Sequence, residues 1–164
     1  MLNEKFIHND PDAFSGKELS LHDCTATDIV CEDGILRFSF PEGFWVCLGH
    51  PENEYGKVIR TGRSAADFKV KNIDDITVSV ITRSLWRRRS NASIETWRIE
   101  QLISTVNSGK CSIEFITQYR SNFEQLWHCV LHSKRRPYYR ECRLHLPESE
   151  AVFRWNDLRS DHEW

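Results

Sequence analysis

Hydrophobic and polar residues alternate along most of this chain, which is the pattern of β-strands with one buried face. In the run 35–40, Leu36 and Phe38 share one face. Arg37 falls on the opposite face. Residues 75–82 are dense in β-branched side chains, which favour pleated sheet. The pattern predicts strands at 25–31, 35–40, 44–48, 57–61, 65–70, 75–82, 93–98, 111–119, 125–133, 138–146 and 151–155.

Short turn motifs separate these runs and favour antiparallel pairing of sequence neighbours. The residues Glu-Asp-Gly at 32–34 are a hairpin signal, and Pro-Glu-Gly at 41–43 form a second turn. Together they predict a three-stranded meander between residues 25 and 48. Residues 1–20 carry scattered Pro, Gly and Ser without a period, so we expect an irregular N-terminal segment there.

One helix is predicted among the strands. Ile99, Leu102 and Val106 recur at the spacing of one helical face. Ile103 falls beside them, and Asn-Ser-Gly at 107–109 supplies a stop directly after the stripe. The sequence therefore predicts an α+β fold, in which one short helix packs on a mainly antiparallel β-sheet.

Length and composition are those of a single globular domain. The chain has 164 residues, 40% of them hydrophobic and 28% charged, so we expect one domain over residues 1–164. It has no run of about 18 apolar residues that could cross a membrane. The first residues also lack the apolar core of a secretory signal. We therefore expect a cytoplasmic protein without a membrane contact.

The net charge of −2 conceals a strong asymmetry along the chain. Residues 1–54 hold eleven acidic and three basic residues, whereas residues 55–164 hold thirteen acidic and nineteen basic ones. Charges so divided can cancel within one fold, or they can create opposed fields that steer charged partners.

Six cysteines without any C-x-x-C pair predict free thiols rather than a disulfide framework or a zinc knuckle. The best metal candidate combines the neighbours His128 and Cys129 with Cys142 and His145. Strand alternation turns the two cysteines into the core and the two histidines away from it. A tetrahedral site needs all four to converge, so we expect buried thiols and neither a metal nor another cofactor.

The familiar motifs of nucleophilic hydrolysis, phosphate binding and zinc catalysis do not occur in the sequence. His22 and Cys24 share one side of a predicted strand, and a nucleophilic cysteine needs a neighbouring base. Alternatively, His22 closes the loop that enters this strand by bonding to backbone groups. One alternative function is therefore that of an enzyme with an unrecognised site at His22, Cys24 or His50.

Two basic clusters suggest phosphate binding. Trp86 precedes three arginines at 87–89, and residues 134–140 read Lys-Arg-Arg-Pro-Tyr-Tyr-Arg. Arginines interleaved with aromatic rings can hold phosphates and stack bases. Charge and proline at strand ends also protect edges from pairing, and the pI near 6.4 is low for a dedicated nucleic-acid binder. A small nucleic-acid-binding module is therefore the second alternative, and nucleic acid is not the expected partner.

Part of the chain resembles a group of small β-rich bacterial proteins. The resemblance rests on Leu-His-Asp-Cys at 21–24, on GILRFSFPEGF at 34–44, on Val106-Asn107 and on Trp-Asn-Asp at 155–157. Some proteins of this group are proposed immunity partners of polymorphic or contact-dependent toxins. The resemblance implies a non-enzymatic inhibitor, and no functional residue is carried over from it.

We expect the acidic N-terminal third to form the binding surface. Acidic residues at turns and loops would steer a basic partner, and an exposed tyrosine would provide a buried anchor in the complex. The expected function is that of a non-enzymatic binding protein that occludes a toxin domain. The residues predicted to contact this partner are Glu32, Asp33, Glu42, Glu52, Glu54 and Tyr55.

Overall fold

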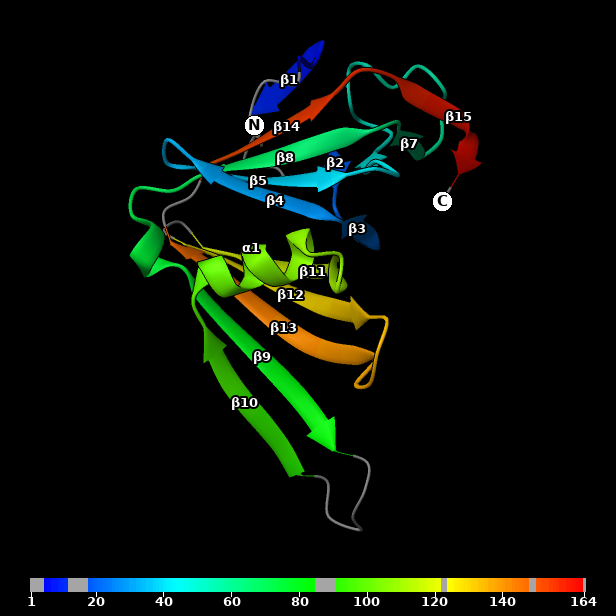
Figure 1. Ribbon diagram of the computed structural model, residues 1–164. Helices are drawn as coiled ribbons and strands as arrows, with labels where there is room; N and C mark the ends of the chain where they lie inside the picture. The colour runs from blue at the N-terminus through cyan, green and yellow to red at the C-terminus, as the bar shows by residue number, and fades with distance from the viewer. Residues whose placement is uncertain (1–4, 12–17, 85–90, 122–123, 148–149, 164) are drawn as a thin grey trace.

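Antiparallel strands dominate the computed structural model, which describes residues 5–11, 18–84, 91–121, 124–147 and 150–163 (Figure 1). The predicted fold class is confirmed, since all strand pairs are antiparallel and one short α-helix accompanies them. The strands are divided among three sheets rather than joined in one. Within the described part of the chain, no helix combines the length and the apolar character needed to cross a bilayer.

The first sheet has five strands and lies in the upper half of Figure 1. The predicted strand at 35–40 lies next to one edge of this sheet, paired on one side with the hairpin strand before it and on the other with the central strand at 64–69. In spatial order the strands are β1 (His8–Pro11), β14 (Glu150–Trp155), β8 (Ser64–Lys69), β5 (Ile35–Phe40) and β4 (Asp28–Glu32).

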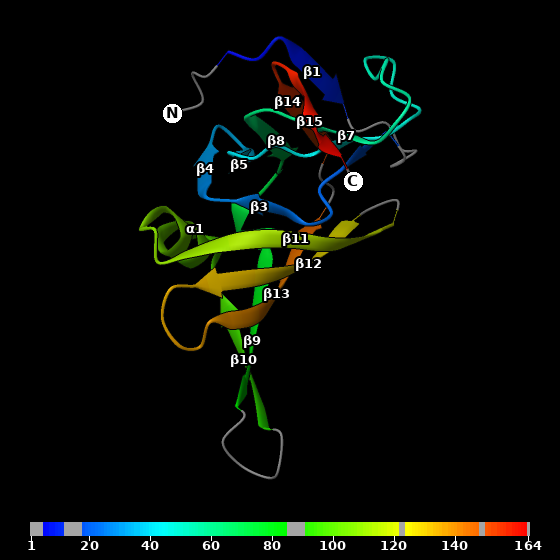
Figure 2. The ribbon, with the colours of Figure 1, turned by 90° about the vertical axis from the view of Figure 1, so that its right-hand side faces the viewer.

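The second sheet has six strands and lies below the first. Its first two strands form a hairpin that projects from the body of the molecule (Figures 1 and 2). In spatial order the strands are β10 (Asn91–Trp97), β9 (Thr77–Ser84), β13 (Tyr139–Pro147), β12 (Glu124–Ser133), β11 (Cys111–Arg120) and β3 (Cys24–Ala26).

A third sheet of four short strands closes one end of the molecule. Its two inner strands flank the loop at residues 47–58, and one of them pairs with the C-terminal strand. In spatial order it contains β15 (Leu158–Glu163), β7 (Ile59–Thr61), β6 (Trp45–Val46) and β2 (Leu19–Ser20). A 3₁₀ turn, η1 (Ile73–Asp75), precedes β9.

Aromatic side chains fill the space between the five- and six-stranded sheets. Phe38 of β5 and Phe115 of β11 meet edge to face with ring centroids 5.2 Å apart. Trp127 of β12 lies 5.2 Å from Phe115 and 6.2 Å from Phe68 of β8, also edge to face. All three phenylalanines are fully buried, so this cluster is the centre of the core.

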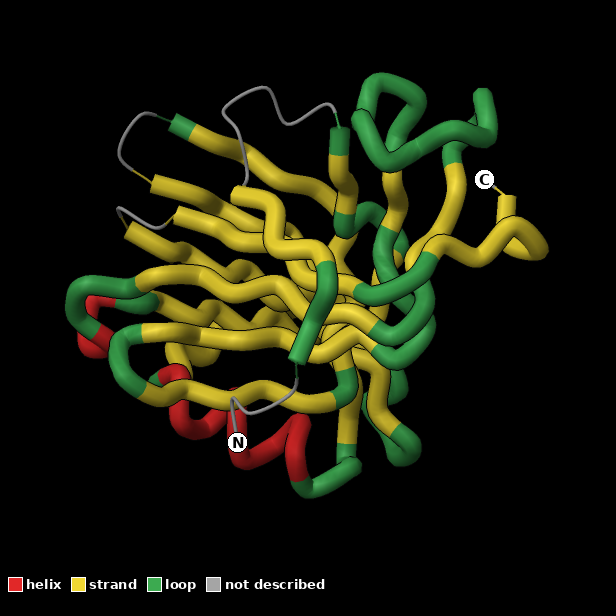
Figure 3. The backbone as a smooth tube through the Cα atoms, turned by 90° about the horizontal axis from the view of Figure 1, so that it is seen from above, coloured by secondary structure: helices red, strands yellow, loops and turns green. Residues whose placement is uncertain are grey.

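The helix α1 (Ile99–Asn107) lies along one side of the stacked sheets (Figure 3). As predicted, Ile99, Leu102 and Val106 are buried. The amide of Asn107 accepts a hydrogen bond from the Ile29 N–H at 2.8 Å and donates one to the Ile29 carbonyl at 2.7 Å. These two bonds satisfy the backbone N–H and carbonyl of Ile29 on the edge strand β4, so the helix end protects this point of an open sheet edge.

Replacing Leu102 with alanine should lower the free energy of unfolding by about 2–5 kcal/mol, because a fully buried leucine leaves a cavity. Glu100 is exposed on the opposite face, and its replacement should cost less than about 1 kcal/mol. Urea denaturation of both variants measures the difference. Equal losses would contradict the assigned buried face of α1.

Several predicted strand boundaries are wrong, and one reason accounts for most of them. Alternation shows which residues face inward but not which sheet receives them. The predicted strand 25–31 is two strands, β3 and β4, that belong to opposite sheets. The predicted meander is wrong as well, because β6 pairs with β2 and β7 instead of β5. The segment 1–20 is not wholly irregular, since β1 pairs with β14 and β2 pairs with β6.

Candidate functional site

The residues predicted to contact a partner lie at two ends of the five-stranded sheet. Glu32 and Asp33 are exposed at the turn between β4 and β5. Glu42 follows the other end of β5, roughly 20 Å away along a six-residue strand, and its carboxylate lies 3.4 Å from the guanidinium of Arg159. Glu52, Glu54 and Tyr55 lie together in the loop that follows β6. The acidic residues therefore do not form one continuous patch.

The loop 47–57 presents its acidic and hydrophobic side chains together. Glu52 and Glu54 are exposed, Tyr55 is 50% exposed, and Leu48 is 60% exposed. We call these four residues the loop surface. Large hydrophobic side chains flanked by carboxylates are the composition expected of a contact site for a basic protein.

The side chain of Asn53 holds this loop closed. Its amide nitrogen lies within hydrogen-bonding distance of three carbonyls, those of Val46 at 3.1 Å, Cys47 at 3.0 Å and Lys57 at 2.9 Å. Its carbonyl oxygen accepts the N–H of Tyr55 at 3.1 Å. Both ends of the loop are thus joined through one residue, which fixes the backbone beneath the loop surface.

His50 fastens the same loop to the five-stranded sheet. The side chain is buried, and its Nδ1 accepts the N–H of Glu52 at 3.2 Å. The Nε2 on the other side of the ring lies 3.2 Å from a carboxylate oxygen of Asp10 on β1. The imidazole also meets the indole of Trp155 edge to face, with ring centroids 5.4 Å apart. The imidazole thus links Glu52 of the loop to β1 and β14 of the five-stranded sheet.

His22 and Cys24 are not arranged as a nucleophile and its base. The Nδ1 of His22 bonds to the carbonyl of Ile116 on β11, so the imidazole ties the entry of β3 to the neighbouring strand. This confirms the backbone role predicted for His22. The thiol of Cys24 instead faces the carbonyls of Ser20 and His22, at 3.8 and 3.4 Å. Burial raises the pKa of Cys24 to about 12, which keeps the thiol protonated at neutral pH.

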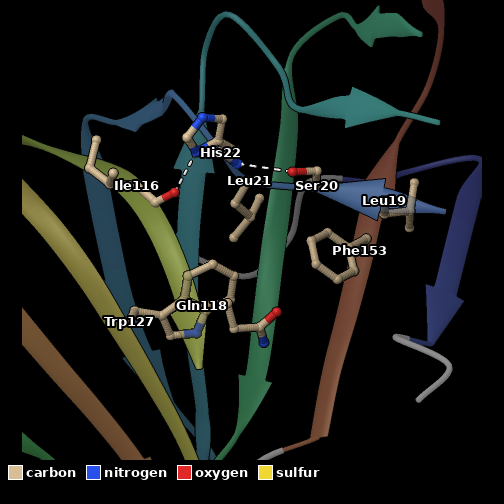
Figure 4. Close-up of a pocket in the computed structure, with 8 residues that line it drawn as sticks. All are labelled: Leu19, Ser20, Leu21, His22, Ile116, Gln118, Trp127 and Phe153. Atoms are coloured by element: carbon tan, nitrogen blue, oxygen red, sulfur yellow. Dashed lines mark hydrogen bonds between the residues drawn. The ribbon is translucent and has the colours of Figure 1, made fainter. Parts of the chain in front are cut away.

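A pocket of about 220 Å³ opens beside His22 between the two larger sheets (Figure 4). The Ser20 hydroxyl accepts the backbone N–H of His22 at 3.2 Å, and the imidazole is directed toward Ile116 (Figure 4). Gln118 donates to Gln125 at 2.9 Å. Ser20 and His22 are thus bonded within the lining of the pocket, Gln118 is bonded to a residue outside it, and the Nε1 of Trp127 is buried without a hydrogen-bond partner. Its lining residues are Leu19, Ser20, Leu21, His22, Ile116, Gln118, Trp127 and Phe153.

The best metal candidate of the sequence is divided between two faces of the six-stranded sheet, as predicted. Cys129 and Cys142 lie directly opposite each other on β12 and β13 and are fully buried as free thiols. His145 is on the outer face, where it lies 2.7 Å from the carboxylate of Glu124. Burial raises the pKa of Cys142 to about 12. Within the described residues, no group of three or more His, Cys, Asp or Glu side chains is placed to hold a metal ion.

The second basic cluster lines a surface groove of about 540 Å³. The turn that carries it lies near the C-terminal end of α1 (Figure 1). Lys134, Arg135 and Arg136 come from the turn between β12 and β13, and Arg140 comes from β13. The fold adds Lys110, which no motif in the sequence groups with them. We call these five cations the basic groove. The first cluster, 87–89, lies outside the described residues.

Comparison of the chain with protein-family models, with curated proteins and with solved structures gives no match. Its function is therefore inferred from the surfaces described above.

Proposed function

We propose that this chain is a non-enzymatic binding protein of the cytoplasm, which uses the loop surface to dock on a basic macromolecular partner and cover it. The resemblance to immunity proteins makes a toxin domain the favoured partner. The observation that carries the proposal is the combination, on one closed loop, of exposed carboxylates with an exposed tyrosine and leucine.

The construction of the loop supports this proposal energetically. A loop that must be ordered on binding loses affinity, whereas a loop already held in place does not incur that cost. Asn53 and His50 fix the backbone on both sides of Glu52. Tyr55 can then bury a large ring at little entropic cost, while the carboxylates raise the association rate with a basic surface.

The cysteines support a reducing compartment. All six are free, and those in the core are neutral thiols because burial raises the pKa of each. A reducing cytoplasm keeps such thiols unpaired, whereas disulfides form and persist in secretory compartments.

Charge reversal of the loop surface tests the proposal. The variant Glu52→Lys/Glu54→Lys is compared with Glu100→Lys/Glu150→Lys, which makes the same change in net charge at exposed positions away from the loop. Each tagged protein is used to capture partners from the source cell. The captured protein is then purified, and its association rate is measured at several salt concentrations.

We expect the loop variant to associate at least about tenfold more slowly than wild type, with a weaker dependence on salt, because the steering charges are reversed. The control variant should associate like wild type. Tyr55→Ala should act mainly on the dissociation rate, because it removes the buried anchor. Recovery of the same partners by wild type and by the loop variant in equal amounts would contradict the proposal.

A further inference from the structure

The basic groove gathers five cations whose charge is not neutralised locally. Within the described part of the chain, the side chains of Lys110, Lys134, Arg135 and Arg136 form no ion pair with a carboxylate. The Nε of Arg140 is buried and has no hydrogen-bond partner there. The C-terminal end of α1 carries a partial negative charge of about half an elementary charge. This is much smaller than the five positive charges of the basic groove.

Two of the guanidinium groups are held against aromatic rings. Arg140 lies over the indole of Trp97 at 4.9 Å, and Arg136 lies over the ring of Tyr138 at 6.0 Å. Such contacts restrict each arginine to one orientation without using its hydrogen-bond donors. The N–H groups remain available for an anion, and a guanidinium presents them in a fork that fits phosphate oxygens.

Exposed aromatic faces adjoin the cations. Tyr138 is 50% exposed and Tyr139 is 69% exposed, and both follow directly after the basic turn. Cations that track phosphates, together with rings on which bases can stack, are the two components of binding sites for single-stranded nucleic acid. A volume of about 540 Å³ is also in the range of pockets that accept small organic groups.

We infer that the basic groove binds single-stranded nucleic acid, with phosphates against Lys110 and the cations of the 134–140 turn and a base stacked on Tyr138. This site is separate from the loop surface: the basic turn joins β12 and β13 of the lower sheet, whereas the loop between β6 and β7 lies at the top of the molecule (Figures 1 and 2). It adds a second activity to the proposed protein-binding function and does not depend on it.

Fluorescence anisotropy with a labelled 12-nucleotide oligo-dT and the matching oligo-U tests the inference. The variant Lys134→Glu/Arg135→Glu is compared with Lys69→Glu/Arg143→Glu, which exchanges one exposed lysine and one exposed arginine elsewhere on the molecule. Tyr138→Ala is compared with Tyr119→Ala, since Tyr119 is 61% exposed on β11. Thermal melting confirms that each variant is folded.

Wild type should bind both oligonucleotides, with a Kd that rises with salt. The groove variant should bind at least about tenfold more weakly at low salt, and the slope of log K against log salt should fall by about 1.4 for two lost phosphate contacts. The matched charge variant should keep the wild-type slope. Tyr138→Ala should weaken binding about fivefold or more, whereas Tyr119→Ala should leave it unchanged.

Three outcomes would overturn the inference. One is the absence of oligonucleotide binding by wild type at low salt. Another is an equal loss in the two charge variants, which would mean that only net charge matters. The last is competition by poly-glutamate as effective as that by unlabelled oligo-dT, which would show that the groove recognises acidic polypeptides rather than nucleic acid.

Discussion

Phe115→Ala is expected to lower the free energy of unfolding by about 3–5 kcal/mol, because Phe115 is the ring that joins the two larger sheets. Its ring centroid lies 5.2 Å from Phe38, 5.6 Å from Phe40 and 5.2 Å from Trp127. Truncation removes three aromatic contacts and leaves a cavity in the middle of the core. Guanidinium denaturation followed by tryptophan fluorescence measures the loss.

The matched control is Tyr119→Ala on the same strand, where the ring is exposed and the change should stay within about 0.5 kcal/mol. A double-mutant cycle of Phe115 and Phe38 should give a coupling of about 0.5–3 kcal/mol, as expected for residues in contact. Additive effects of the two substitutions would contradict a direct contact between the sheets at this point.

Local patterns in the sequence predicted the elements whose partners are close along the chain. The strands β11, β12 and β13 follow one another through short turns, and their buried and outward residues match the alternation. The hairpin of β4 and β5 is confirmed for the same reason. The helix was predictable because Leu102 and its neighbours repeat at a helical period and a stop follows them.

Partners distant in the sequence could not be predicted in this way. The strand β1 has polar residues, His8 and Asp10, where a core strand would have apolar ones, because its inward contacts are a ring stack of His8 on Trp155 and the pairing of Asp10 with His50. Neither contact leaves a periodic signal. Likewise, the chain passes from the six-stranded sheet to the five-stranded sheet at Thr27. This crossing depends on which strands have an unpaired edge in the folded protein, and the sequence pattern does not show that.

The candidate surfaces show the same limit. The sequence identified Glu52, Glu54 and Tyr55 as one exposed group, since they are neighbours in a single loop. It could not show that Glu32 lies at the other end of the sheet, or that Lys110 joins the turn at 134–140. Charge counts along the chain therefore left open whether the two halves cancel or form opposed surfaces, and the fold determines which charged residues lie together.

Asp67→Ala should also lower the free energy of unfolding by about 3–5 kcal/mol, because it removes the buried carboxylate that pairs with the guanidinium groups of Arg37 and Arg154. The Asp67 carboxylate is 4% exposed and accepts hydrogen bonds from the Arg37 Nε at 2.5 Å and its Nη2 at 2.7 Å. The Arg154 Nε donates to it at 2.6 Å. These residues lie on β8, β5 and β14, and the N-terminal segment covers them, with Phe6 against Arg37 and Asn9 bonded to Arg154.

The control for Asp67 replaces the entire network. In the triple variant Arg37→Met/Asp67→Leu/Arg154→Met no charge is left unpaired, so it should be more stable than Asp67→Ala alone, although it carries more substitutions. Arg154→Met alone should cost less than Asp67→Ala, because the Arg154 side chain is 27% exposed and Arg37 still pairs with Asp67. Denaturation of the three variants gives the order. If the triple variant were the least stable, the three side chains would stabilise the sheet through their net attraction, and the loss in Asp67→Ala would not arise from removing one carboxylate while the two guanidinium groups stay.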